Sequence, residues 1–104
     1  MILKISDAIP NNRKGNHLSG QLIRSGTSAS LNYGEAQSSE SRKDFIHKIK
    51  IVLKELRETY ICLKIIKKAK LCKVIDKIET ALMENDELIS IFVKSVETAQ
   101  KKLN

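Results

Sequence analysis

Proline occurs only once in this chain, at Pro10, so no residue from 11 to 104 blocks helix formation outright. The same stretch is rich in Lys, Glu and Leu, which have high helix propensity, and only 4% of all residues are aromatic. These features predict an all-α chain. With 104 residues there is enough chain for one modest core, so we expect a single domain spanning residues 1–104.

Apolar residues recur at steps of three and four, and this pattern divides the chain into helices at about 2–9, 17–38, 41–69 and 72–102. Ser41 and Asp44 approximate a capping box at the start of the third helix. Pro10, Asn11 and the residues up to Asn16 indicate a loop before the second. In the last helix Asn85 falls among apolar positions, where a buried polar residue often fixes helix register.

Residues 24–37, RSGTSASLNYGEAQ, are unusually small and polar for a helix. Placed on a helix from His17 to Ser38, they give it small or apolar side chains on two sides. Such a helix contacts two neighbours, because small residues let backbones approach and Ser and Asn can hydrogen-bond between helices. A Gly/Ser loop is the alternative. The candidate interface residues, within the bundle or between subunits, are Ile23, Ser25, Gly26, Ser28, Ala29, Asn32 and Tyr33.

Charge is unevenly distributed in this basic chain, whose net charge is +7. Residues 42–73 hold eleven Lys or Arg against three acids, whereas residues 74–99 hold six acids against two Lys. Six of the basic residues fall on one side of the third helix, and these candidate nucleic-acid-binding residues are Lys43, Lys50, Lys54, Arg57, Lys64 and Lys68. Such a stripe can follow a phosphate backbone, although a solvated helix face has the same composition. Without an aromatic platform, we expect weak, largely sequence-independent binding of RNA or DNA.

The sequence contains few patterns that indicate a catalytic, metal-binding or cofactor-binding site. Arg42 and His47 have the R-x4-H spacing that resembles the motif of helical-bundle ribonucleases, and an enzyme hypothesis rests on these two residues alone. No Cys-x2-Cys pair, paired histidines or phosphate-binding loop is present, so we expect no metal and no cofactor. We expect Cys62 and Cys72 to be reduced packing residues. No apolar run of about 20 residues and no signal peptide is evident, which favours a cytoplasmic protein without membrane contact.

Residues 21–66 resemble the bacterial 23S rRNA intervening-sequence proteins, also called four-helix bundle proteins. The shared pattern is Gln-Leu-x-Arg followed by small residues, then Asn, Glu and Ser, and then an amphipathic helix with paired acids. In this sequence the matching positions are Gln21, Leu22, Arg24, Ser25, Gly26, Ser28, Asn32, Glu35, Ala36, Ser41, Lys43, Asp44, Phe45, Ile46, Glu55 and Glu58.

The resemblance implies an antiparallel up-and-down four-helix bundle that assembles as a homopentamer. We expect no enzymatic activity. Members are encoded within insertions in large-subunit rRNA genes, or elsewhere, and most have no assigned activity. A related group serves as accessory protein of diversity-generating retroelements, where a basic pentamer engages nucleic acid and polymerase. The alternative is a ring that binds a protein partner and has no role with nucleic acid.

One departure from the family concerns the first helix, which is shortened here to about residues 2–9. We expect a groove along the other three helices to stay open unless residues upstream of Met1 or another subunit fill it.

Overall fold

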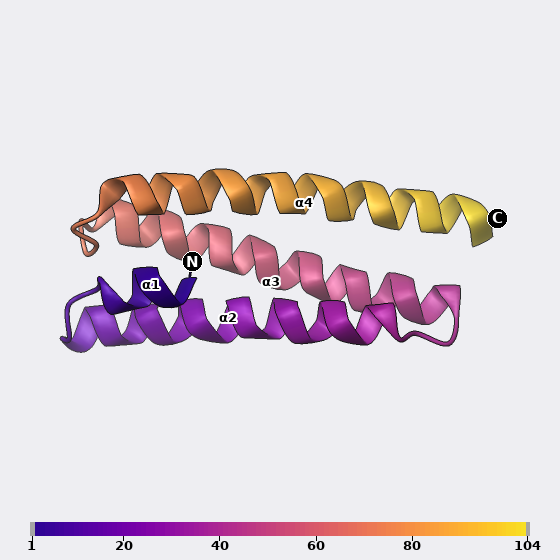
Figure 1. Cartoon of the computed structure of the whole chain (residues 1–104), viewed down its shortest axis with the longest axis horizontal. Helices are drawn as coiled ribbons and strands as arrows, with labels where there is room; N and C mark the ends of the chain where they lie inside the picture. Colours follow the sequence, from indigo (N-terminus) through magenta and orange to yellow (C-terminus); the bar gives the residue numbers. More distant parts are fainter. Residues whose placement is uncertain (1, 104) are drawn as a thin grey trace.

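Four helices follow one another in the computed structural model, which describes residues 2–103 apart from the side chain of Leu3 and has no strand in this range. They are α1 (Ile2–Asp7), α2 (Arg13–Gln37), α3 (Arg42–Lys68) and α4 (Ile75–Leu103). Consecutive helices run in opposite directions, and the bundle is elongated, 49 × 20 × 16 Å (Figure 1). The all-α prediction is confirmed.

The second helix begins earlier than the sequence pattern indicates. Residues Arg13 to Asn16 are helical, whereas the pattern predicts a loop up to Asn16. The reason is the cap: the side-chain oxygen of Asn12 accepts a hydrogen bond from the backbone N–H of Gly15 at 2.8 Å. Asn12 therefore stops the loop and starts the helix within two residues of Pro10.

The stretch rich in Ser, Gly and Asn is helical throughout, which excludes the loop alternative. Its polar side chains bond back to the helix that carries them. The Ser30 hydroxyl donates to the carbonyl of Gly26 at 3.1 Å, and the Asn32 amide donates to the carbonyl of Ser28 at 2.9 Å. These side chains are thereby satisfied without unwinding the helix.

The turn between α3 and α4 is formed without glycine or proline. Lys70 has a positive φ of 55°, and the backbone N–H of Leu71 donates to the carbonyl of Ile66 at 3.1 Å. A second bond joins the N–H of Lys70 to the carbonyl of Lys67. This pair of bonds is the Schellman arrangement that ends many helices, in which glycine usually takes the left-handed position.

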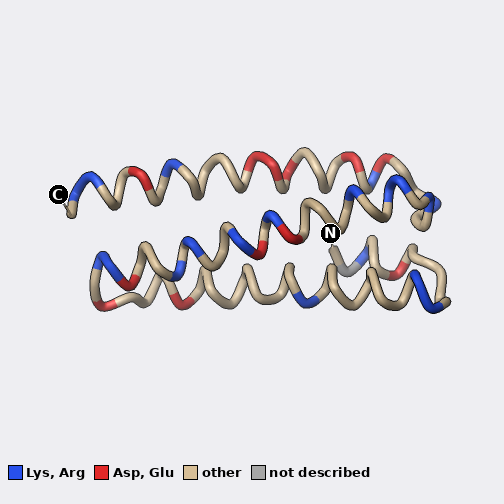
Figure 2. The backbone as a smooth tube through the Cα atoms, turned by 180° about the vertical axis from the view of Figure 1, so that it is seen from behind, with Lys and Arg blue, Asp and Glu red and all other residues tan. Residues whose placement is uncertain are grey.

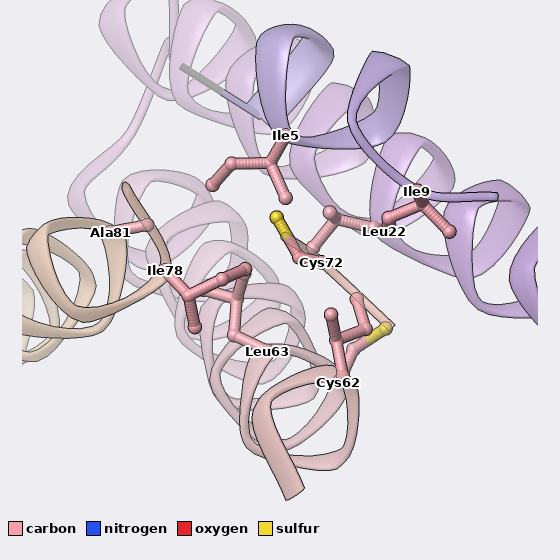
Figure 3. Packing of buried hydrophobic residues seen from close by; sticks show 9 residues of the cluster. Ile5, Ile9, Leu22, Cys62, Leu63, Cys72, Ile78 and Ala81 are labelled. Atoms are coloured by element: carbon pink, nitrogen blue, oxygen red, sulfur yellow. The ribbon is translucent and has the colours of Figure 1, made fainter. Parts of the chain in front are cut away.

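The core is widest where α1 adds its side chains. Ile5 points between the three long helices, and Ile5 and Ile9 belong to a cluster that includes Leu22, Leu63 and Ile78 (Figure 3). A second apolar region follows along α2, α3 and α4, with Ala36, Ile49, Leu53, Val96 and Ala99 at its centre. In that half no described residue of α1 is present.

Packing of the long helices is organised around α3. It lies against α2 along one side and against α4 along the other, while the backbones of α2 and α4 do not approach each other among residues 2–103. Their side chains meet across α3, for example where the rings of Tyr33 and Phe92 pack edge to face with centroids 5.4 Å apart. The short α1 occupies the space between α2 and α4 on one half only (Figure 1).

Asn85 is the polar residue that the apolar pattern of α4 singles out. It is buried, and its side-chain amide donates to the backbone carbonyl of Leu56 in α3 at 2.8 Å. This bond forms at one axial position of α4 against α3, as expected of a residue that fixes register. None of the helices among residues 2–103 combines the length and the apolar character needed to cross a membrane.

Two glycines of α2 provide a test of this packing. A Cβ on Gly15 would lie 2.1 Å from the carbonyl oxygen of Pro10, whereas a Cβ on Gly20 would meet nothing within 4 Å. We expect Gly20→Ala to stabilise the chain by about 0.5–1 kcal/mol through helix propensity, and Gly15→Ala to destabilise it by more than about 1 kcal/mol. Thermal and urea unfolding followed by circular dichroism measures both. Equal effects of the two substitutions would contradict the close approach at Gly15.

Candidate nucleic-acid interface

The six basic residues predicted from the sequence form a continuous stripe on α3. Lys43, Lys50, Lys54, Arg57, Lys64 and Lys68 are all exposed. At a rise of 1.5 Å per residue the stripe is about 38 Å long. Figure 2 shows the basic positions along α3 from the side on which this helix lies in front, with a series of acidic positions along α4.

None of these six side chains takes part in the ion pairs found among residues 2–103. The pairs there join Arg24 to Glu55 and Glu58, Lys48 to Glu35, and Lys67 to Glu79. Within the stripe, the Lys64 ammonium lies 5.3 Å from the centre of the Tyr60 ring. The acidic helix α4 therefore leaves the charge of the stripe without a direct partner in the described chain.

Close to the stripe, a polar seam joins α2 to α3. The guanidinium of Arg24 donates to Glu55, which is buried, at 3.1 Å, and also to Glu58. The hydrogen bond to Glu58 and the charge of Glu55 raise the pKa of Arg24 above its usual value. The ammonium of Lys48 bonds to Glu35 at 2.8 Å, and this hydrogen bond likewise raises the pKa of Lys48. These pairs fix the two helices to each other.

Four of the predicted interface residues contact other helices of the same chain. Ser25 and Ala29 are buried against α3, and Ala29 packs in a cluster with Val52 and Leu56. Gly26 lies beneath Ile2 of α1, since a Cβ added there would come within 2.9 Å of the Ile2 side chain. Tyr33 packs on Phe92 of α4. The small residues thus serve close approach inside one bundle.

The other three predicted interface residues lie toward the outside of α2. Ile23 is exposed, and Ser28 and Asn32 are half-buried and hydrogen-bonded to each other. Nearby, Leu31 is 65% exposed, which is high for a large apolar side chain. With Thr27 these residues line a shallow hollow on the outer face of α2. We define Ile23, Thr27 and Leu31 as the outer apolar face of α2.

Arg42 and His47 are not brought together within the chain. Both are exposed, and five residues of helix rotate them by about 140° around the axis of α3. Arg42 lines a cavity at the end of the bundle, and His47 is not among the residues around it. The described residues contain no group of three or more His, Cys, Asp or Glu side chains that could hold a metal ion.

Cys62 and Cys72 are free and buried in the core beside α1 (Figure 3). Burial raises the pKa of the Cys62 thiol, which keeps it protonated and unreactive. Both cysteines are packing residues in this geometry.

The arrangement of helices and the polar seam can now be compared with known proteins. The family model of 23S rRNA-intervening sequence proteins matches residues 1–94. The chain belongs to this family. A crystal structure from Bacteroides thetaiotaomicron, of a protein of unknown function from the S23 ribosomal protein family, is 29% identical, with a TM-score of 0.82 over 91% of this chain and 87% of that one. No curated protein matches the chain.

In this member of the 23S rRNA-intervening sequence proteins, four of the residues that match the family pattern meet at the α2–α3 seam. Arg24, Glu55 and Glu58 form its ionic part, and Ser25 forms its buried part with Thr59, whose hydroxyl lies 2.7 Å from that of Ser25. In this chain these four residues therefore join two helices.

Sequence reasoning missed a second group of cations. Arg42, Lys94 and Lys102 line one cavity, although they lie on two different helices. Periodicity within one helix cannot show this, because the group depends on how α3 and α4 are placed. The residue in the sequence that could have pointed to this cavity is Ile91. It is apolar, it lines the same cavity, and its side chain is 60% exposed.

The buried hydroxyl pair of the seam can be tested by a double-mutant cycle. We expect Ser25→Ala and Thr59→Val each to destabilise the chain by about 1 kcal/mol, because each leaves a buried hydroxyl or carbonyl with fewer partners. The double variant should lose less than the sum, since removal of both hydroxyls leaves neither unpaired. Urea unfolding gives the three values. Ser30→Ala, at an exposed serine of the same helix, is the control and should change stability little; strict additivity of the two core changes would contradict the pairing.

Proposed function

We propose that this 23S rRNA-intervening sequence protein is a non-enzymatic, oligomeric protein that associates with nucleic acid through the stripe on α3. The observation that carries the proposal is that six exposed cations follow one helix face and none of them is paired with an acid among residues 2–103. Counterions condensed on a polyanion would be released as these cations approach, which favours binding at low salt.

The chemistry of the stripe supports recognition of charge rather than of sequence. Its length of about 38 Å is close to one turn of duplex, which is about 34–36 Å. A straight row of this length can contact phosphates on both sides of a groove, or follow a flexible single strand. The aromatic ring beside it, Tyr60, is already covered by Lys64, so no stacking platform for bases is offered.

We further propose that the chain assembles as a homopentamer, as the family resemblance implies. The outer apolar face of α2 supports an association between copies, because Ile23 and Leu31 are exposed there while the buried residues of the same helix face the bundle. Five copies of the stripe in one ring would add their fields and strengthen attraction of a polyanion.

An interaction ring without nucleic acid is the second candidate function. The exposed apolar residues of α2 favour it, together with Ile61 and Ile65 on α3, which are 58% and 46% exposed. Both candidates predict assembly, and they differ in whether the stripe is used.

Reversal of charge in the middle of the stripe tests the nucleic-acid role. Lys50→Glu, Lys54→Glu and Arg57→Glu together should weaken binding of labelled single-stranded RNA, duplex RNA and duplex DNA by at least tenfold at near-physiological salt, as measured by fluorescence anisotropy. The control is the triple variant Lys14→Glu, Lys73→Glu and Lys101→Glu, which changes net charge equally at exposed positions outside the stripe. The stripe-reversed variant should bind much more weakly than the control.

Equal loss in the two triple variants would show that net charge, and not the stripe, attracts nucleic acid. If the native chain binds none of the three probes, the interaction ring is favoured. The same samples on a denaturing gel examine the ribonuclease hypothesis, which RNA cleavage lost on His47→Ala would support.

Assembly is tested at the outer apolar face of α2. Light scattering after size exclusion should give a mass of five 11.7-kDa chains for the native protein. Leu31→Glu should lower this mass, because it places a charge in the contact. Met83→Glu is a matched control, since Met83 on α4 is 62% exposed and Leu31 is 65% exposed. A native mass of one chain would exclude the pentamer under those conditions.

A further inference from the structure

α1 covers the space between α2 and α4 over only part of its length. At one end α1 occupies it, with Ile2 lying over Gly26 of α2. Beyond Gly26 no described helix lies between α2 and α4, and there the rings of Tyr33 and Phe92 meet across α3. Figure 1 shows α1 beside one end of the three long helices, with its N-terminal end directed toward the middle of the bundle. We call this part the open groove.

The open groove ends in a cavity of about 800 Å³ between the three long helices. Its apolar lining comes from Ala36 of α2, Phe45 of α3, and Ile91 and Ala99 of α4. Ile91 is 60% exposed, and Phe45 is half-buried. Contact of these apolar side chains with water is unfavourable. A ligand that covers them with its own apolar face removes apolar surface from water, and this favours binding.

Charge around the same cavity is mainly positive. Arg42, Lys94 and Lys102 line it, and Glu40 is the acid among the described lining residues. None of the three cations belongs to the ion pairs found in the described part of the chain. An occupant therefore needs acidic side chains beside its apolar face.

The shape of a suitable occupant is shown by α1. This helix enters the same space with Ile2 and Ile5 three residues apart and Ile9, after its last turn, four residues further on. A helix with apolar residues at steps of three and four thus fits between α2 and α4, and the open groove continues the same line. Along α4 the lining residues of the cavity run from Ile91 to Lys102, which is about 16 Å, or three helical turns.

We propose that the open groove binds an amphipathic helix of a partner protein, about three turns long, with one apolar face and acidic residues along both of its edges. A polyanion without apolar groups would leave Phe45 and Ile91 uncovered, which disfavours nucleic acid as the occupant. A second copy of this chain is the other protein occupant to consider, and the variants below separate it from a partner helix. This inference does not depend on the role of the stripe.

The probe is a fluorescein-labelled, acetylated 14-residue peptide with Leu at positions 3, 6, 10 and 13, Glu at the flanking positions and Ala and Gln elsewhere. We expect saturable binding to the full chain, measured by anisotropy. A peptide of the same composition in scrambled order, and one with Lys in place of every Glu, should each bind at least tenfold more weakly.

Variants locate the site. Ile91→Glu should weaken binding of the Glu peptide at least tenfold, whereas Met83→Glu, at an equally exposed apolar residue of α4 outside the cavity, should change it less than twofold. Lys94→Glu with Lys102→Glu should weaken the Glu peptide at least fivefold and strengthen binding of the Lys peptide. All four positions are exposed, so we expect the variants to fold as the native chain does.

Three results would overturn the proposal. One is no saturable binding up to millimolar peptide, and another is equal binding of the scrambled peptide. The third is self-association that Ile91→Glu abolishes and Met83→Glu does not, which would assign the open groove to a second copy.

Discussion

α2 and α4 are held in place through α3. The two flanking helices meet one another at the edge-to-face contact of Tyr33 and Phe92, so α3 must present apolar side chains on two flanks at once. A helix that does this has only its outer face left for charges, and the basic stripe occupies that face. Packing therefore determines where charges on α3 can lie. It does not determine their sign, since acidic residues on the same face would be solvated equally well. The positive sign is therefore the part that packing leaves unexplained.

Features that depend on spacing within one helix were predictable from the sequence. The all-α class, the cap at Ser41 and the placement of Asn85 among apolar residues all follow from periodicity and local propensity. What could not be predicted depends on the rotation of one helix against another. The hydroxyls of Ser25 and Thr59, which are 34 residues apart, meet only because both helices turn them inward, and the cations around the open groove are likewise contributed by separate helices.

At two places the local structure differs from what the sequence pattern indicates, and each difference has a physical reason. Asn12 caps α2 so close to Pro10 that the expected loop is short. Lys70 takes a left-handed conformation that glycine usually supplies, so the turn between α3 and α4 left no clear signal in the sequence. For the candidate sites, exposure of the stripe could be expected from its helix face, whereas most of the small residues of α2 are used inside the bundle.

The segregation of charge between α3 and α4 has a consequence for motion in solution. Because Lys and Arg gather on one long helix and acids on its neighbour, the molecule carries a dipole moment directed across its short dimension, in addition to its net charge (Figure 2). A field exerts a torque on such a dipole, so a polyanion of the kind proposed as a partner would turn the basic side of the molecule toward its phosphates before any contact forms. Orientation would then be set during the approach, at distances where no side chain has yet reached a phosphate.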